Sequence, residues 1–360
     1  MKLFLGFSFV LLVFNSSISF ANEFYGQIFA EVNQANLMNL LKDMTGTNTV
    51  KIGSESIQIT ERYSAQGKKK FRSYFTDYFQ KLGLEVKTLS YPTTHTEIET
   101  EGHNVEAILR GESPDSVVVI VHYDSMGSYG EETANPAVDD DMTGMAISLE
   151  TARILSEYVN SGRAKLKYTV RFVAADFEEW GGLEGARNYA DYIKDLAASE
   201  KFKLVAAVDN EQSGWNCADD GLCNSPETID IFSCSPGGQY DFPEQGDLLE
   251  NIVKSYSSLQ ISRSCMGEHS DHYAMWEIGI PSVVYSEHQP FDNPHFDFEG
   301  GDSLDKINQS YFFKLAQVGV TFAVELGGLT PSPNKSITSN QGSDSIKNRL
   351  NSTENSSGIR

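Results

Sequence analysis

Hydrophobic and polar residues alternate with two different periods along this chain. Between residues 64 and 82, aromatic and aliphatic side chains recur at helical spacing, and Gly83 follows, which predicts a helix that ends there. The same period predicts further helices over residues 144–159, 185–196, 243–259 and 307–325. Short apolar runs predict strands at residues 85–89, 104–109, 117–121, 166–175, 204–208 and 280–285.

Strands that alternate with helices favour βαβ units, in which helices cover a sheet of mostly parallel strands. We therefore expect an α/β fold with a mixed, mostly parallel central sheet and helices on both faces. The chain has 360 residues, and we expect its main domain to span residues 51–329.

The first 21 residues have the features of a secretory signal peptide. Lys2 provides a positive charge, an apolar stretch runs from Leu3 to Phe14, and Ala21 closes a small-x-small cleavage site. The apolar stretch is short for a membrane span, and no second one follows it. We therefore expect export, to the periplasm or to the extracellular medium.

Two further segments differ from the main domain. In residues 22–50, the leucines at positions 37, 40 and 41 suggest a short helix, and a propeptide is one interpretation of this segment. Residues 330–360 are rich in serine and asparagine and have no hydrophobic period, which predicts a flexible tail.

The charge and the cysteines limit the partners and the compartment. A formal net charge of −22 repels nucleic acid and anionic membranes, so we expect neither as a partner. The four cysteines lack the paired spacing of a structural zinc site. In an exported protein a local Cys217–Cys223 bridge is the favoured pairing, with free thiols as the alternative.

Side chains that bind metals follow the predicted strands. In open α/β sheets, ligands bind outside the carboxyl ends of the strands, and imidazole and carboxylate are ligands that catalytic zinc accepts. The candidate ligands are His122, Asp140, the pair Glu178-Glu179, Asp209 and His295. This set predicts a metallohydrolase.

Neighbouring residues offer supporting roles in such a site. Asp124 lies two residues after His122, where its carboxylate could orient a metal-bound imidazole. In the pair Glu178-Glu179, one side chain can bind metal while the other serves as a general base. The acidic run 139–141 lacks the spaced oxygen ligands of a calcium loop.

These motifs together resemble the co-catalytic di-zinc aminopeptidases of the bacterial leucyl aminopeptidase type. The resemblance covers about residues 50 to 328 and rests on His-Tyr-Asp-Ser, Asp-Asp-Asp-Met-Thr-Gly, Glu-Glu-Trp-Gly-Gly-Leu-Glu-Gly-Ala, Val-Asp, Ser-Asp-His and Gly-Ile-Pro, in that order. It implies two Zn²⁺ ions held by His122, Asp140, Glu179, Asp209 and a final histidine. It also implies that Asp140 bridges the two ions, that Glu178 is the general base and that Asp124 orients His122.

The chain departs from this family pattern at two places. The final ligand is His295 by residue type, Asp297 by counting from the preceding Asn-Pro, and His288 as a third choice. A short Cys-to-Cys loop found in some relatives is replaced here by Cys265 and His269, so we expect Cys265 to be free or to pair elsewhere. The Ser-Asp-His stretch at 270–272 is interpreted as a hydrogen-bonded turn at the rim of the site.

The resemblance implies an aminopeptidase that acts on peptides with a free N-terminus, and we expect a monomer. Aromatic residues Tyr273, Tyr285 and Phe291 suggest a preference for large apolar N-terminal residues. Two alternatives remain open. One is a glutaminyl cyclase-like acyltransferase with a single zinc, and the other is a non-catalytic extracellular binding domain on the same fold.

Overall fold

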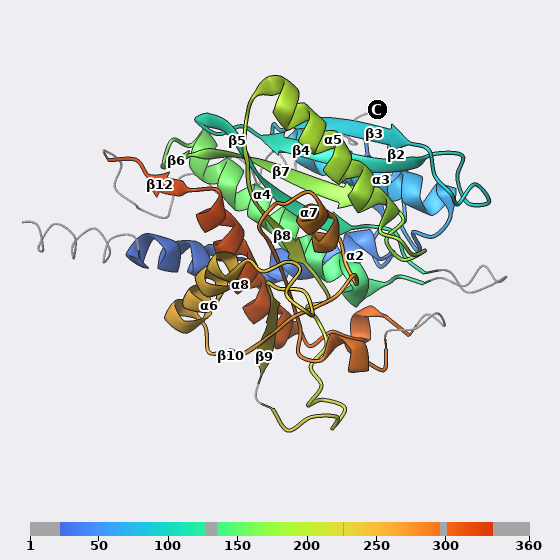
Figure 1. Cartoon of the computed structure of the whole chain (residues 1–360). Helices are drawn as coiled ribbons and strands as arrows, with labels where there is room; N and C mark the ends of the chain where they lie inside the picture. Colours follow the sequence, from blue (N-terminus) through green and yellow to red (C-terminus); the bar gives the residue numbers. More distant parts are fainter. Residues whose placement is uncertain (1–21, 127–134, 226, 296–300, 334–360) are drawn as a thin grey trace, which may run out of the picture.

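An eight-stranded sheet forms the centre of the molecule (Figure 1). The computed structural model describes residues 22–126, 135–225, 227–295 and 301–333. The strands of the sheet are β3 (Glu85–Tyr91), β4 (Gly102–Leu109), β5 (Ser113–His122), β7 (Tyr168–Ala175), β8 (Leu204–Asn210), β9 (Thr228–Phe232), β10 (Gln260–Ser264) and β11 (Ser282–Ser286). Their spatial order is β10-β9-β11-β8-β5-β7-β4-β3.

The middle of the sheet is parallel. Strands β7, β5, β8 and β11 run in one direction, whereas β4 pairs antiparallel with β7, and β9 pairs antiparallel with β11. The expected mixed, mostly parallel sheet is confirmed. The carboxyl ends of the four central strands therefore meet at one edge of the sheet, where ligands of such folds bind.

Helices cover both faces of the sheet, as predicted. One face packs against α2 (Gln34–Met44), α3 (Ala65–Lys81), α4 (Gly144–Asn160), α6 (Pro243–Tyr256) and α8 (Gln309–Leu326). The other face packs against α5 (Glu184–Glu200) and α7 (His272–Glu277), which lie in front of the sheet in Figure 1. Strand β5 is apolar toward both layers because Val119 and Val121 belong to the first core and Val118 and Ile120 to the second.

Helix α3 forms where the aromatic stripe predicted it. The Ser64 side chain caps its first turn by accepting from the Gly67 amide, and Gly83 adopts a positive φ of 86° just after its last turn. Phe71 and Phe75 on the inner face are fully buried. The stripe is core packing, which fixes the helix against β3 and β4.

The N-terminal segment is part of this core. Residues 22–31 are helical, and they and α2 bury Phe24, Ile28, Leu37 and Leu41 to an exposure of 2% or less. The short helix expected around these leucines is confirmed. Helix α2 contacts α4 and α8, so the segment covers the rear of the sheet.

Smaller elements complete the chain. The predicted strand over 166–175 is divided at Lys167 into β6 (Ala164–Leu166) and β7, and β6 pairs antiparallel with β12 (Leu329–Pro331). The Tyr25 hydroxyl donates to the Leu329 carbonyl at 3.2 Å, so both described ends of the chain lie beside the start of β7. The remaining elements are the hairpin β1 (Val50–Ile52) and β2 (Glu55–Ile57), the π-helical turn η1 (Val138–Thr143) and the 3₁₀ turns η2 (Pro290–Asp292) and η3 (Leu304–Lys306).

The cysteines form two disulfides. The predicted Cys217–Cys223 bridge is confirmed, and Cys265 pairs with Cys234. The second bridge joins the ends of the adjacent parallel strands β9 and β10. Within the ranges that the structure describes, no helix is both long and apolar enough to cross a membrane. The expected signal peptide and most of the expected tail lie outside those ranges.

Candidate metal centre

Three side chains that can bind a metal converge at the carboxyl edge of the sheet. His122 ends β5, Glu211 follows β8 directly, and Asp140 lies in η1. The His122 Nε2 atom is 2.8 Å from Asp140 Oδ1 and 3.8 Å from Glu211 Oε1. One donor atom from each of the three lies within 4.8 Å of the others, and all three residues are buried.

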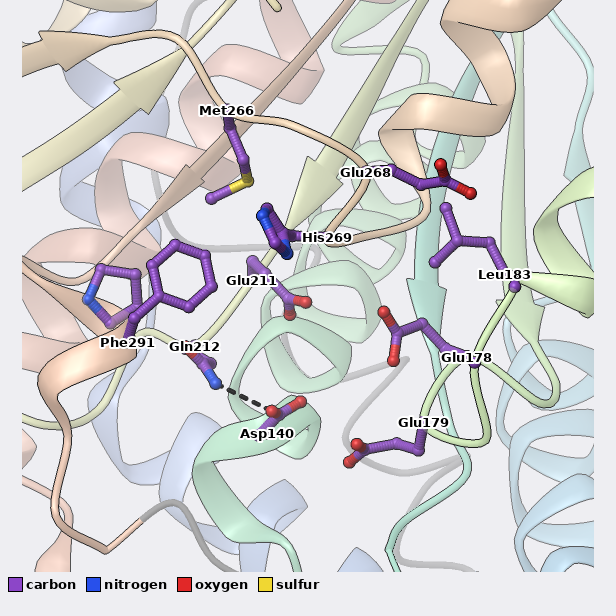
Figure 2. A pocket seen from close by; sticks show the side chains of 13 residues that line it. Asp140, Glu178, Glu179, Leu183, Glu211, Gln212, Met266, Glu268, His269 and Phe291 are labelled. Atoms are coloured by element: carbon purple, nitrogen blue, oxygen red, sulfur yellow. Dashed lines mark hydrogen bonds between the residues drawn. The ribbon is translucent and has the colours of Figure 1, made fainter. Parts of the chain in front are cut away.

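This group opens into a cavity of about 390 Å³. Figure 2 shows the carboxylates of Asp140, Glu178, Glu179 and Glu211 turned toward the same space. Glu178 and Glu179 reach it from the loop that follows β7. The fold thus brings together acidic side chains from three separate segments of the sequence.

The turn that carries Asp140 is held by hydrogen bonds from both sides. The backbone amides of Asp139 and Asp140 donate to the Asp302 carboxylate at 2.8 and 3.0 Å. The Gln212 side chain donates to Asp140 Oδ2 at 2.8 Å, as the dashed line in Figure 2 marks. These hydrogen bonds fix the orientation of the Asp140 carboxylate.

Asp124 positions the loop with the two glutamates. Its two oxygens accept from the amides of Glu178 at 3.1 Å and of Glu179 at 3.2 Å. Its Oδ1 atom lies 3.7 Å from His122 Nδ1, a charge contact beyond hydrogen-bond distance. In this structure Asp124 thus contacts both the imidazole and the backbone of the glutamate pair.

The electrostatics of the cavity favour a cation. Burial, together with repulsion from neighbouring carboxylates, raises the pKa values of Glu178, Glu179 and Glu211 well above their ordinary range. Burial opposes protonation of His122, but the carboxylates of Asp124 and Asp140 outweigh it and raise the imidazole pKa well above its usual value. The buried carboxylates of Asp140 and Glu211, with the partly buried Glu178 and Glu179 beside them, favour compensation by positive charge, which a divalent metal supplies.

The structure does not bring Asp209 into the His122 group. Its Oδ2 atom accepts from the Ser270 hydroxyl at 2.7 Å and from the His272 amide at 2.9 Å. The Ser-Asp-His stretch forms the hydrogen-bonded turn that we expected, with Asp209 as its anchor. Glu211, which sequence reasoning missed, takes the place beside His122 because β8 continues to Asn210, beyond its predicted end at 208.

Two of the three candidates for the final ligand, His295 and His288, lie within the described residues and contact other carboxylates. The His295 Nε2 atom lies 3.0 Å from Asp220, away from the group of His122, and His288 contacts Asp230 at 2.8 Å. Asp297, the alternative, lies outside the described residues.

Apolar side chains form the other part of the cavity wall. Leu183, Met266, Pro290 and Phe291 line it, and Phe291 packs edge-on against the exposed ring of His269. Of the aromatic residues expected near the substrate, Phe291 is present in this wall. Tyr285 is fully buried instead. Met266 could not be singled out from the sequence, because it lies between predicted elements and next to neither.

Comparison with known proteins identifies a family and individual relatives for this chain. The family model described as "Peptidase family M28" matches residues 104–322. Leucine aminopeptidase 1 of Ajellomyces dermatitidis is 25% identical over 279 residues, which cover 71% of this chain and 68% of that protein. The family resemblance inferred from the motifs is confirmed.

Solved structures share the fold. The aminopeptidase LapA of Legionella pneumophila has a TM-score of 0.65 at 18% identity, covering 85% of this chain and 75% of its own. The zinc aminopeptidase BSAP of Bacillus subtilis has a TM-score of 0.63 at 13% identity, covering 85% and 97%. Macrostomum lignano glutaminyl cyclase has a TM-score of 0.66 at 17% identity, covering 86% and 94%.

Proposed function

The chain belongs to peptidase family M28, and on that premise we propose that it is a zinc-dependent aminopeptidase that removes N-terminal residues from peptides. The observation that carries this proposal is the buried group of His122, Asp140 and Glu211 beside the acidic cavity. Glu178 and Glu179 face the same cavity (Figure 2). The relatives named above as aminopeptidases support the same activity.

The residues present fit zinc. One imidazole and two carboxylates, buried and close together, are donors that catalytic zinc sites use, and such sites keep a coordination position open. We propose that His122, Asp140, Glu179 and Glu211 would hold two zinc ions. Bound zinc supplies Lewis acidity, which polarises a scissile carbonyl and makes the attacking water more acidic.

Glu178 is the proposed general base. Its carboxylate faces the cavity while its amide is fixed by Asp124, so the side chain meets the attacking water in a defined orientation. It removes the proton of that water and returns it to the leaving amine. The raised pKa of Glu178, caused by burial and neighbouring acids, brings its proton affinity closer to that needed for both steps.

The cavity also explains why the substrate would be cleaved from its N-terminus. A free α-ammonium group would find acidic side chains where Glu178 and Glu179 line the cavity. The apolar wall of Leu183, Met266 and Phe291 suits a large apolar side chain on the first residue. We propose peptides with such N-terminal residues as substrates.

The proposed setting is extracytoplasmic. Two disulfides close within the described residues, and such bridges persist in oxidising compartments. The N-terminal sequence has the features of a signal peptide. We propose that the exported protein acts as a monomer.

A glutaminyl cyclase activity is the second candidate, because the fold is shared with the cyclase of Macrostomum lignano. Cyclisation is an acyl transfer within one substrate and uses no attacking water. The distinction therefore lies in the product: a released amino acid for the peptidase, or a pyroglutamyl peptide for the cyclase.

The deciding experiment measures zinc content per mole of purified protein together with hydrolysis of leucine p-nitroanilide. We expect two zinc ions per chain, loss of hydrolysis after treatment with 1,10-phenanthroline, and its return when zinc is added. A parallel assay follows peptides with N-terminal glutamine by mass. One zinc, no release of p-nitroaniline and formation of pyroglutamyl peptide would replace the peptidase proposal with the cyclase.

A further inference from the structure

A single buried arginine holds together the backbone around the metal centre. Arg62 is fully buried, and its guanidinium donates to four main-chain carbonyls. The acceptors are Tyr123 at 2.7 Å, Pro136 and Ala137 at 2.9 Å each, and Met44 at 3.3 Å. Burial lowers the Arg62 pKa to about 10, which leaves the side chain cationic at neutral pH.

These acceptors flank the proposed metal ligands. Tyr123 directly follows His122, and Ala137 lies three residues before Asp140. Arg62 thus connects the segment that carries the imidazole to the segment that carries the Asp140 carboxylate. The Arg62 amide also donates to the Ser125 hydroxyl at 3.1 Å, which adds a second connection on the side of His122.

Asp302 holds the other end of the same turn. Its carboxylate accepts from the amides of Asp139 and Asp140. The Arg62 guanidinium donates to the carbonyls of Pro136 and Ala137, which come just before them. Asp302 also provides the largest favourable charge near the Arg62 guanidinium. Arg62 and Asp302 therefore hold four backbone groups of this turn, the carbonyls of residues 136 and 137 and the amides of residues 139 and 140.

We propose that Arg62 and Asp302 are a pair of positioning residues that set the spacing of His122 and Asp140 and thereby the affinity for zinc. The inference rests on the proposed function only in taking these two side chains as metal ligands. Neither residue lines the substrate cavity. Their effect therefore reaches the metal through the backbone that they hold.

The chemistry of the arginine is specific for this role. A guanidinium offers five donors in a rigid plane and can serve several carbonyls in different directions at once. A lysine at the same position keeps the charge but cannot reproduce this fork. It leaves carbonyls among those of Tyr123, Pro136 and Ala137 without this donor, so their backbone can shift.

The test compares zinc affinity in Arg62→Lys, Asp302→Asn and the unchanged full chain, by competition with a chromophoric chelator. We expect each substitution to weaken zinc binding about 10- to 100-fold, the usual effect of losing a group that orients metal ligands. We also expect hydrolysis of leucine p-nitroanilide by either variant to be lost at low free zinc and largely restored by excess zinc, with little change in KM.

Arg171→Lys is the matched control. Arg171 is a second buried arginine, and it lies in β7. Its guanidinium donates to Glu106 at 2.7 Å and to Ser116 at 3.1 Å, away from the metal group. We expect this variant to lose thermal stability but to keep the zinc affinity of the unchanged protein. The control therefore separates positioning from general packing.

The outcomes distinguish this inference from the proposed function. Loss of stability in Arg62→Lys with unchanged zinc affinity would overturn the positioning role. If Arg62→Lys does not fold, Asp302→Asn, which keeps the side-chain shape, decides by the same criterion. An unchanged protein that binds zinc but releases no leucine would contradict the peptidase alone, and one that binds no zinc would overturn both.

Discussion

Glu211 stands at the end of β8 with its carboxylate 3.8 Å from His122, and burial beside Asp140 raises its pKa. Asp209, two residues earlier, accepts hydrogen bonds from Ser270 and His272. In a strand, residues two apart lie on the same face, so only the position along the strand separates their roles. Glu211 lines the cavity. Asp209 accepts the hydrogen bonds that hold the turn at residues 270–272.

Substitution separates these two carboxylates. We expect Glu211→Gln to reduce zinc affinity by more than the 10- to 100-fold typical of residues that only orient ligands, because it removes a proposed ligand. Asp209→Asn should stay within that smaller range. Chelator competition on both variants measures the difference, and the reverse order would restore Asp209 as the ligand.

The proposed general base, Glu178, can be recognised by a loss of turnover without a loss of zinc. Glu178→Gln should reduce turnover of leucine p-nitroanilide about 10²- to 10⁴-fold, because the water loses its proton acceptor. Zinc content should stay the same, since this side chain is not among the proposed ligands. Glu200→Gln, at the end of α5, is the control with the same change of charge. Substantial remaining turnover in Glu178→Gln would exclude this assignment.

Asp176 predicts a pH dependence of stability. Burial raises its pKa from 3.8 to about 6, although Lys68 at 3.1 Å opposes the shift. Between these values the folded state holds a proton that the unfolded state has lost. The free energy of unfolding therefore falls as pH rises from about 4 to about 6, by about 2–3 kcal/mol, and stays lower above.

The measurement is urea unfolding of the unchanged protein and of Asp176→Asn at a series of pH values. The variant cannot titrate at this position, so the difference in unfolding free energy between the two proteins should change over pH 4 to 6. Asp191→Asn, on the exposed surface of α5, should follow the unchanged protein. A constant difference between Asp176→Asn and the unchanged protein would contradict the raised pKa.

The sequence allowed some of these residues to be placed and not others. His122 and the pair Glu178-Glu179 follow long apolar runs, so the ends of their strands were evident. The end of β8 was set two residues early because its last residues, Asp209 and Asn210, are polar although buried. Because ligands were sought at strand ends, the early end led to Asp209 as the predicted ligand in place of Glu211.

At the scale of elements, hydrophobic runs identified the strands that are buried on both faces. Strand β10 was missed because it lies at the edge of the sheet and is mostly exposed, so it carries no apolar run. Strand β9 was missed because Asp230 interrupts its short apolar pattern. Helix α7 has only six residues, too few for a period to be recognised.

The two disulfides should differ in their contribution to stability. Cys217–Cys223 closes a separation of 6 residues, whereas Cys234–Cys265 closes a separation of 31. Loop-closure entropy in the unfolded chain predicts a loss of about 2 kcal/mol when the first is replaced by alanines and about 4 kcal/mol for the second. Urea unfolding of the two double variants measures this, and equal losses would contradict the entropic account.

At the scale of the whole molecule, the segment 22–50 behaves as part of the core. Its removal would delete Phe24, Ile28, Leu37 and Leu41 and expose the core side chains around them, and the burial lost with each is worth about 1.5–3 kcal/mol. That sum is comparable with the total stability of an ordinary domain. A propeptide at this position would therefore leave an unstable mature protein.

A variant that begins at Lys51 tests this expectation. We expect it to unfold at least 10 °C lower than the unchanged protein, or not to fold, as measured by thermal unfolding. A variant that lacks residues 334–360 loses a similar length of chain and should keep its melting temperature. A stable, active variant from Lys51 would support the propeptide interpretation instead, as would a natural N-terminus beyond residue 50.

Both described ends of the chain lie beside the start of β7, where Tyr25 contacts Leu329 and β6 leads into the strand. The loop with Glu178 follows the opposite end of this strand, which has eight residues and spans about 26 Å. A tether attached at either described end, Asn22 or Pro333, therefore leaves the mouth of the cavity clear. The protein could be fixed to a bead or fused to a carrier and still receive peptides from solution.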